Sequence, residues 1–271
     1  MCRKLALLAT VLTLAGAPAL AATAASPASP AKASKASPTP PAPRKVTAEE
    51  RLEAERLDPL GRAAFWSRVM EADPRDTDAA IKLAKALRAL GRFDDAGAAV
   101  DQVLVVEPNN LEALLESARA KIAANQGFYA IDLVQRAASL APRDWRPQAL
   151  LAVALEQADR DDEALSAHQK ALAMAPNNPA TLTNLGMFYA THGDPQSAEP
   201  LLRKAVAAPG AGAQERQNLA LILGMEGRLD EAERLARQDL PPDVVSNNLD
   251  YLHAAINPAP ARSWESVKTA Q

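Results

Sequence analysis

One period of this chain is visible in residues 145–178, which read WRPQALLAVALEQADRDDEALSAHQKALAMAPNN. This stretch is 34 residues long, and its small, turn-forming and helix-ending residues recur at the same interval elsewhere. The members of the four series are Pro74, Pro108, Pro142 and Pro176; Ala96, Ala130, Ala164, Ala198 and Ala232; Ala84, Ala118, Ala152, Gly186 and Ala220; and Gly91, Asn125, Asp159, Gly193 and Gly227. Because the four series share one phase, the chain is predicted to be built from structural repeats.

Each series has a physical role in a pair of antiparallel helices. Two helices approach closely only where the facing side chains are small, so one Ala or Gly of each helix is expected at the crossing. The Gly, Asn or Asp residue ends the first helix in a left-handed conformation, and the proline ends the second helix. Asn178-Pro179 and Asp194-Pro195 each predict a cap followed by the first residue of a helix. Pro200 is expected to interrupt a second helix, and a kink is expected at the early break Pro209-Gly210.

This pattern resembles the tetratricopeptide repeat family, whose unit is a 34-residue helix–turn–helix with small residues and a proline at fixed places. The resemblance implies an all-α protein, a right-handed superhelix (α-solenoid) of about five repeats with capping helices at both ends. The expected repeats are residues 77–110, 111–144, 145–178, 179–212 and 213–240. Residues 46–76, which contain the capping-box sequence Thr47 to Glu50 and the helix start Asp58-Pro59, are expected to form the N-terminal capping helices. Residues 241–255 are expected to form the C-terminal one, followed by a flexible tail over 256–271.

The first 21 residues have the features of a cleavable signal peptide. Arg3 and Lys4 precede an apolar run from Leu5 to Leu14, and small residues around Ala21 suit signal peptidase. The alternative is an uncleaved anchor, although the run is shorter than the roughly twenty residues that span a bilayer. Cys2 precedes the apolar run, so it does not match a lipoprotein cysteine. We therefore expect a periplasmic protein without a transmembrane helix in its mature chain, carrying a proline-rich, disordered linker over residues 22–45.

Composition excludes several other classes of function. The formal net charge of −3 leaves no basic excess for phosphates, so nucleic acid is not an expected partner. The three histidines, His168, His192 and His253, share no metal-ligand spacing, and His168 is expected to be a packed core residue. Acidic pairs such as Asp94-Asp95 fall at predicted helix N-termini, where the helix dipole explains them. We expect no catalytic residues, no metal site and no cofactor.

The expected binding surface is the inner, concave face, which the first helix of each repeat lines in proteins of this kind. By repeat phase its residues are Lys82, Lys85, Arg88, Leu115, Arg119, Ile122, Val153, Glu156, Asn184, Met187, Asn218, Leu221 and Met225. Such a face suits an extended or helical peptide. In the family, asparagines placed like Asn184 and Asn218 often bind the backbone of a bound peptide. The alternative is that these asparagines and the Lys/Arg group are only solvated.

Several C-terminal segments carry a narrower resemblance. Residues 216–224 (RQNLALILG), 227–233 (GRLDEAE), 239–243 (DLPPD) and 248–252 (NLDYL) are similar to the TadD family of the tight-adherence (Flp) pilus system. The resemblance implies a scaffold that helps to assemble the secretin pore, or another component, of a Flp pilus secretion system. Relatives are commonly lipid-anchored at the outer membrane, but the lipid-attachment cysteine is absent at the expected place here. The alternatives are a general periplasmic chaperone-like adaptor and a regulatory subunit of cell-envelope enzymes.

Overall fold

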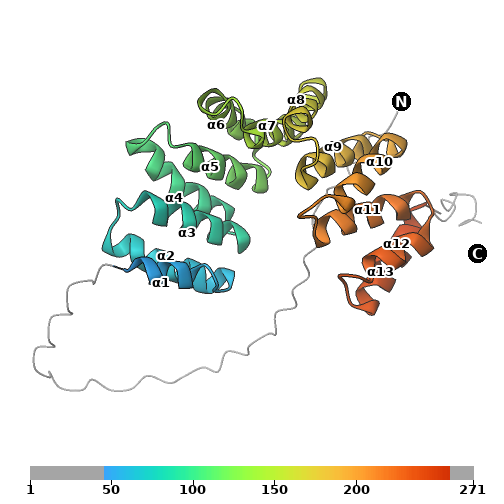
Figure 1. Ribbon diagram of the computed structural model, residues 1–271, viewed down its shortest axis with the longest axis horizontal. Helices are drawn as coiled ribbons and strands as arrows, with labels where there is room; N and C mark the ends of the chain where they lie inside the picture. The colour runs from blue at the N-terminus through green and yellow to red at the C-terminus, as the bar shows by residue number, and fades with distance from the viewer. Residues whose placement is uncertain (1–45, 257–271) are drawn as a thin grey trace, which may run out of the picture. The chain divides into compact units, whose positions relative to one another are not determined.

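The computed structural model describes residues 46–256. The predicted signal peptide (1–21), the linker (22–45) and the tail beyond 256 lie outside the described residues. Within residues 46–256 there are thirteen helices and no strand, as Figure 1 shows. Their bounds are α1 (Ala48–Ala54), α2 (Pro59–Ala72), α3 (Thr77–Ala89), α4 (Phe93–Val106), α5 (Leu111–Ala123), α6 (Gly127–Leu140), α7 (Trp145–Gln157), α8 (Asp161–Met174), α9 (Pro179–Thr191), α10 (Pro195–Ala207), α11 (Ala213–Met225), α12 (Leu229–Ala236) and α13 (Pro242–Ile256).

The turn within each pair of helices has the left-handed backbone that the sequence predicts. The φ angles are 74° at Gly91, 58° at Asn125, 56° at Asp159 and 80° at both Gly193 and Gly227. Only glycine takes this conformation without steric cost, and Asn and Asp are the residues that best tolerate it otherwise. The first helices of the five pairs accordingly begin at Thr77, Leu111, Trp145, Pro179 and Ala213.

The small residues of the second helices are buried at every repeat. Ala96, Ala130, Ala164 and Ala198 are 0% exposed and Ala232 is 1% exposed. The small series of the first helices, from Ala84 to Ala220, is buried as well. Paired helices therefore lie close together along the whole stack, which confirms the predicted all-α repeat architecture.

The expectation for Pro200 was wrong. Helix α10 runs without interruption from Pro195 to Ala207, with Pro200 inside it. Proline lacks an N–H and so removes one hydrogen bond of the helix, but its side chain is exposed here and the flanking turns keep their helical conformation. The chain leaves the helix only at Ala208, followed by a left-handed Gly210 with φ of 87°.

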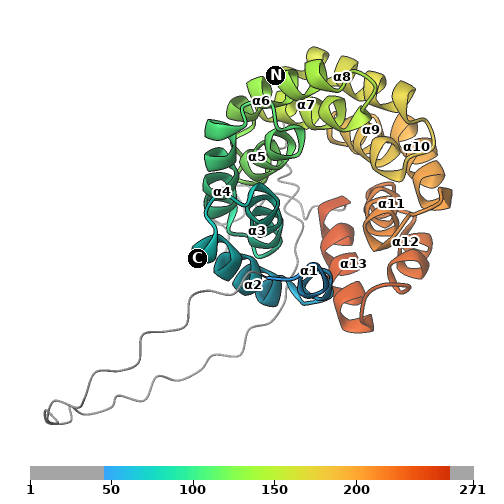
Figure 2. The ribbon, with the colours of Figure 1, turned by 60° about the vertical axis from the view of Figure 1, so that its left-hand side comes forward.

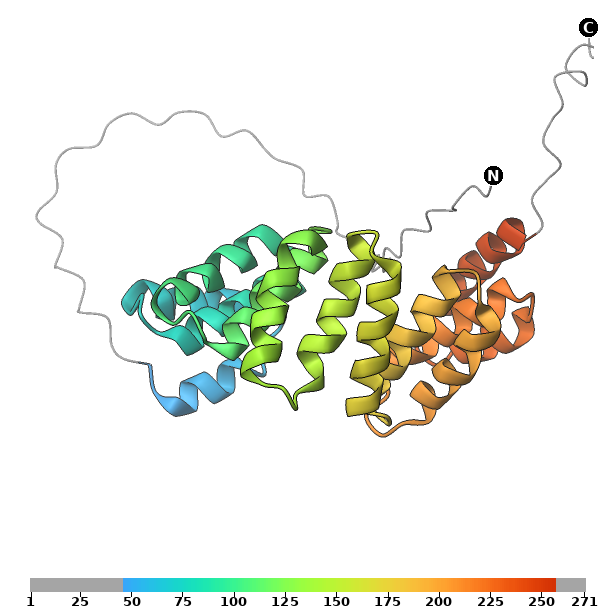
Figure 3. The same ribbon diagram turned by 90° about the horizontal axis from the view of Figure 1, so that it is seen from above.

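First and second helices occupy different sides of the stack. In Figure 2, helices α3, α5, α7, α9 and α11 lie on the inner side and α4, α6, α8, α10 and α12 lie outside them. The backbones of consecutive first helices approach one another closely, whereas those of consecutive second helices do not; each second helix packs on the first helices of its own and the next unit, or on α13 at the end. Inner elements are thus closer together than outer ones, so the stack of residues 46–256 curves. Figure 3 shows the helices at its middle, green to yellow, lying side by side.

Helices α1 and α2 cover the N-terminal end of the stack. The Thr47 hydroxyl accepts a hydrogen bond from Glu50 N–H, and the Glu50 carboxylate accepts one from Thr47 N–H, which is the predicted capping box. Asp58 caps α2 in the same way through Gly61 N–H. Trp66 of α2 is fully buried in a cluster with Ala54, Val69 and Ala79, so α2 packs firmly on α3.

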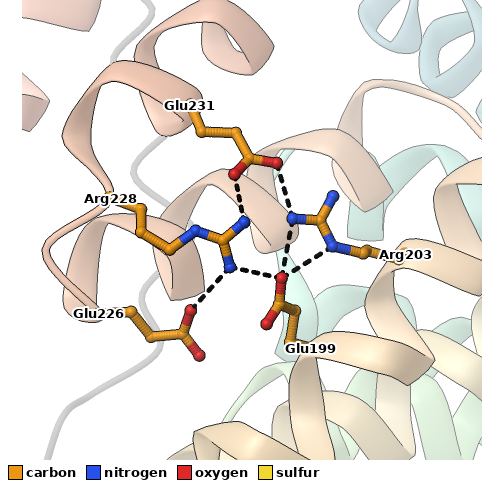
Figure 4. A network of polar contacts seen from close by, with 5 residues as sticks. All are labelled: Glu199, Arg203, Glu226, Arg228 and Glu231. Atoms are coloured by element: carbon orange, nitrogen blue, oxygen red, sulfur yellow. Dashed lines mark hydrogen bonds and ion pairs between the residues drawn. The ribbon is translucent and has the colours of Figure 1, made fainter.

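An ionic network joins the outer helices of the last two units, as Figure 4 shows. Glu199 of α10 accepts hydrogen bonds from Arg203, at 2.8 Å, and from Arg228, at 2.5 Å. Arg203 also binds Glu231 of α12 at 2.6 Å, and Arg228 binds Glu231 and Glu226. The hydrogen bond from Arg228 is the main cause that lowers the pKa of Glu199 below its ordinary value, and Arg203 does the same for Glu231.

This network predicts a dependence of stability on pH. Because the folded-state pKa of Glu199 is depressed, its contribution is present above the unfolded pKa of about 4.3 and is lost as the pH falls through the folded value. Glu199→Gln should therefore lower the free energy of unfolding at neutral pH, and its deficit relative to wild type should shrink below about pH 4. Urea unfolding, monitored by circular dichroism at pH 7 and below pH 4, measures the free energy of unfolding of both proteins. The control is Glu71→Gln, at an exposed position; a Glu199→Gln deficit that stays constant with pH would contradict the assignment.

Candidate functional site

The inner face consists of the accessible side chains of α3, α5, α7, α9 and α11. Two residues of each first helix, 34 residues apart from unit to unit, define most of it. One series is Lys82, Glu116, Leu150, Asn184 and Asn218, and the other is Lys85, Arg119, Val153, Met187 and Leu221. Except for Glu116, all of them are half-buried or exposed. The predicted surface is therefore largely brought together on one side of the stack.

Leu115 was wrongly assigned to this surface. Its side chain is 0% exposed and packs with Leu114 and Ala137, against which Leu104 and Leu150 also lie. The equivalent residues of the other units explain why. Ile81, Ala149 and Thr183 are buried as well and Gln217 is half-buried, because this position of the first helix faces its neighbours and not the open side.

Glu116 and Leu150 are the residues that sequence reasoning missed. Both follow from Lys82 by counting steps of 34 residues, so the signal was present in the repeat phase. Glu116 is fully buried and binds two of the predicted basic residues, Arg88 at 2.6 Å and Arg119 at 3.2 Å. A buried carboxylate needs such partners. The three charges together leave a net charge of +1 between α3 and α5.

Most other charges on the first half of the inner face are also paired. Lys82 binds Glu55 at 3.0 Å and Asp78 at 3.7 Å, and its ammonium lies 4.8 Å from the centre of the Trp66 ring. Arg146 of α7 reaches back to Glu112 of α5 at 2.8 Å. Lys85 is exposed and has no ion-pair partner among residues 46–256. The Lys/Arg group is therefore mainly part of a network of ion pairs that joins α3 and α5 to their neighbours, and it is not a free basic patch.

The second half of the inner face, on α9 and α11, is uncharged at the predicted positions. Asn184 and Asn218 are half-buried, and their side-chain amides form no hydrogen bond within the described part of the chain. Next to them lie the half-buried Met187 and the exposed Leu221 and Met225, which are 37% and 39% exposed. An amide offers both a donor and an acceptor, which is what the backbone of a bound peptide needs. Thioether side chains adapt to different apolar partners.

The remaining predicted residues have structural contacts. Glu156 binds His168 at 2.5 Å, and His168 is 1% exposed and lies 5.4 Å from Phe188, so its assignment as a packed residue is confirmed. Ile122 and Val153 are half-buried, and Ile122 packs against the cluster around Ala118 and Leu155. In residues 46–256 no group of three or more His, Cys, Asp or Glu side chains is placed to hold a metal ion. In the same range, no helix has both the length and the apolar character needed to cross a membrane.

A hollow of about 530 Å³ lies away from the inner face, between α2 and α4. It exists because Ala80 and Ala99 stand where the next unit has Leu114 and Leu133. Its apolar lining includes Val105 and no residue of the predicted surface. The hollow is therefore separate from the inner face, which is an open surface and not a cavity.

Curved stacks of paired helices with an accessible inner face define a helical repeat protein. Two family models match the chain: one described as "Tetratrico peptide repeat" over residues 54–143 and 179–270, more than half of the chain, and one described as "Tetratricopeptide repeat" over residues 145–209. The chain belongs to the tetratricopeptide repeat family.

Individual relatives agree on the fold. A thermophilic TPR protein from Thermus thermophilus is similar with a TM-score of 0.58 and 24% identity, over 65% of this chain and 98% of that one. A tetratricopeptide repeat protein from Parabacteroides merdae ATCC 43184 has a TM-score of 0.63 and 12% identity, over 76% and 80%. Cellulose synthase operon protein C of Pseudomonas fluorescens (strain SBW25) is 35% identical over 132 residues, which are 48% of this chain but only 10% of that protein. The chain thus matches about a tenth of that relative's length.

The contrast between Leu115 and Leu221 gives a direct test of this face. Leu115→Asp places an unpaired carboxyl group in the core and removes a packed side chain, so it should lower the free energy of unfolding by about 3–5 kcal/mol. Leu221→Asp, at an exposed position of α11, should cost about 1 kcal/mol or less. Chemical denaturation measures both variants. Equal destabilisation by the two would show that the inner face is placed wrongly.

Proposed function

We propose that this protein is a non-enzymatic, periplasmic scaffold that holds a segment of another protein on its inner face. The family supports a role in protein–protein interaction, because a tetratricopeptide repeat stack offers an extended surface and little else. We further propose that it acts in the assembly of a Flp pilus secretion system, with a secretin or another pilus component as its partner. The TadD-like segments between Arg216 and Leu252 and the signal-like N-terminus support this finer role.

One observation carries the proposed binding mode. Asn184 and Asn218 occupy equivalent places on the neighbouring helices α9 and α11, and neither amide has a partner within the described residues. Two such amides in register can bind the backbone of one extended or helical segment. The nearby Met187, Leu221 and Met225 can cover apolar side chains of that segment. Because both amides are half-buried and not used within the described residues, they remain available to a partner; the alternative is that they are only solvated.

The charges on the first half of the inner face can determine the direction in which a bound segment lies. The group Arg88–Glu116–Arg119 carries a net charge of +1, and Lys85 adds an exposed ammonium. Both lie on α3 and α5, away from the uncharged inner-face positions of α9 and α11. A segment whose apolar part lies on α9 and α11 and whose acidic end lies toward α3 would match both halves. Such charges set direction and association rate more than affinity.

A second function is favoured by one relative. The similarity to a cellulose synthase operon protein over 132 residues supports an adaptor or regulatory subunit for cell-envelope enzymes. Only a tenth of that relative is matched, so the shared role is proposed from this similarity alone. Both functions use the same inner face and differ in the partner.

The partner can be identified with an affinity-tagged full chain purified from the cell-envelope fraction. Asn184→Ala combined with Asn218→Ala should weaken the complex about 30-fold, since two hydrogen bonds of about 1 kcal/mol each are lost. Asn109→Ala, at an exposed position between α4 and α5, is the matched control and should retain the partner. Quantitative mass spectrometry of the co-eluting proteins gives both the identity and the loss.

The identity of the partner decides between the two functions. Capture of a secretin or a pilin-system protein supports assembly of a pilus, and capture of a polysaccharide synthase or another envelope enzyme supports the alternative. If the double variant captures the same partner as strongly as the control does, the inner-face site is refuted.

A further inference from the structure

The first turn of the outer helix differs in one unit. Four units carry polar pairs there, namely Asp94-Asp95, Asp162-Glu163, Gln196-Ser197 and Asp230-Glu231. Unit two carries Phe128-Tyr129 at the equivalent place, at the start of α6. The other four units show that the repeat does not need apolar side chains at this position. The fold therefore does not require the aromatic pair.

Both aromatic side chains face solvent. Phe128 is 69% exposed and Tyr129 is 68% exposed. Their ring centres lie 5.6 Å apart with the planes at 84°, so the rings pack edge to face and form one platform. The base of this platform is rigid, because a Cβ at Gly127 would lie only 2.6 Å from that of Gln157, which means that the start of α6 presses against the end of α7.

The unpaired charges near the platform are acidic. Asp132 lies one helical turn beyond Phe128, where side chains four residues apart are neighbours. Asp94 lines the same small hollow as Gln126, the residue before α6, and Lys121 in that hollow is paired with Asp101 at 3.5 Å. Asp162 occupies the first turn of the next outer helix, α8, one unit further along the stack. None of the three has an ion-pair partner within the described range. The basic residues of these turns are already engaged, Arg92 with Asp95 at 2.8 Å and Arg160 with Glu163 at 2.7 Å.

The sign of the local charge decides which partner fits. The N-terminus of α6 contributes a partial positive charge of about half a unit, against the two whole carboxylates of Asp94 and Asp132, with Asp162 one unit further along. A cation is therefore favoured, and an exposed aromatic face attracts Lys and Arg side chains directly. Apolar side chains of the same segment can cover the ring edges.

We propose that Phe128, Tyr129 and the carboxylates around them form a second docking site, on the outer side of the stack, for a Lys- or Arg-rich protein segment that also carries apolar side chains. In this site a guanidinium or ammonium group stacks on an aromatic ring. Neighbouring basic residues of the segment face Asp94, Asp132 and Asp162. The site lies on α6 and its outer neighbours, so it does not depend on the function proposed for the inner face and allows two partners to be held at once.

The test uses the full chain and short fluorescently labelled peptides of alternating Lys and Leu, with Glu/Leu and Lys/Ser peptides of the same length for comparison. Fluorescence anisotropy should show that the Lys/Leu peptide binds about ten-fold tighter than either of the others. The double variant Phe128→Asp with Tyr129→Glu gives unit two the residue pair of unit three. It should weaken binding about ten-fold, although it adds two negative charges that would strengthen a purely Coulombic contact.

Two further variants keep the test decisive. Val105→Ser removes another exposed apolar side chain, 81% exposed, and introduces the residue that unit two has at the equivalent place; it should bind like wild type. Phe128→Gln with Tyr129→Ser, the pair of unit four, replaces the first variant if that one melts early. Binding unchanged in the folded double variant, or equal binding of the Lys/Leu and Glu/Leu peptides, would overturn the proposal. A wild-type dimer that the variant loses in sedimentation would overturn it too, because the occupant would then be a second copy.

Discussion

The close approach of paired helices at small side chains is the constraint on which the rest of the structure depends. Ala96, Ala130 and Ala164 are fully buried where a second helix crosses a first, and Gly186 shows how tight such a crossing becomes. A Cβ on Gly186 would lie 2.9 Å from Leu202 Cγ, so this crossing has no room even for alanine without a shift. Because the crossings recur every 34 residues, each unit is related to the next by nearly the same step. A repeated step produces a curved stack, and a curved stack produces an inner face.

The inner face then divides according to how its side chains are paired. Across α3, α5 and α7, ion pairs such as Arg88–Glu116 and Glu112–Arg146 join consecutive first helices. Across α9 and α11, the amides of Asn184 and Asn218 have no partner within residues 46–256. The ion pairs of the first half therefore mainly hold the stack together and leave Lys85 exposed, whereas the second half is free to bind. The ionic network around Glu199 and Arg228 performs the joining role on the outer side of that second half.

The fold could be predicted from the sequence because its determinants are local and repeated. Each turn between paired helices follows from a Gly, Asn or Asp at one phase, and each helix crossing follows from an Ala or Gly at another. The candidate site was less predictable, since residue type alone does not give exposure: Leu115 and Leu221 are both leucines of a first helix, but Leu115 holds a different repeat position and packs with Leu114 and Ala137 in the core. Ion pairing could not be predicted either, because the sequence does not show that Glu116 lies between Arg88 and Arg119 and binds both. The continuity of α10 through Pro200 could not be predicted either, since it depends on the turns that flank the proline.

Replacing the crossing alanines tests the central constraint most directly. Each of Ala96, Ala130, Ala164, Ala198 and Ala232 is changed singly to Leu, and the free energy of unfolding is measured by chemical denaturation. Overpacking at a crossing should cost about 1–3 kcal/mol in every unit. Ala173→Leu, on the exposed side of α8, should change stability by less than about 0.5 kcal/mol. Crossing variants as stable as Ala173→Leu would mean that side-chain size there does not set the helix spacing, and the account would fail.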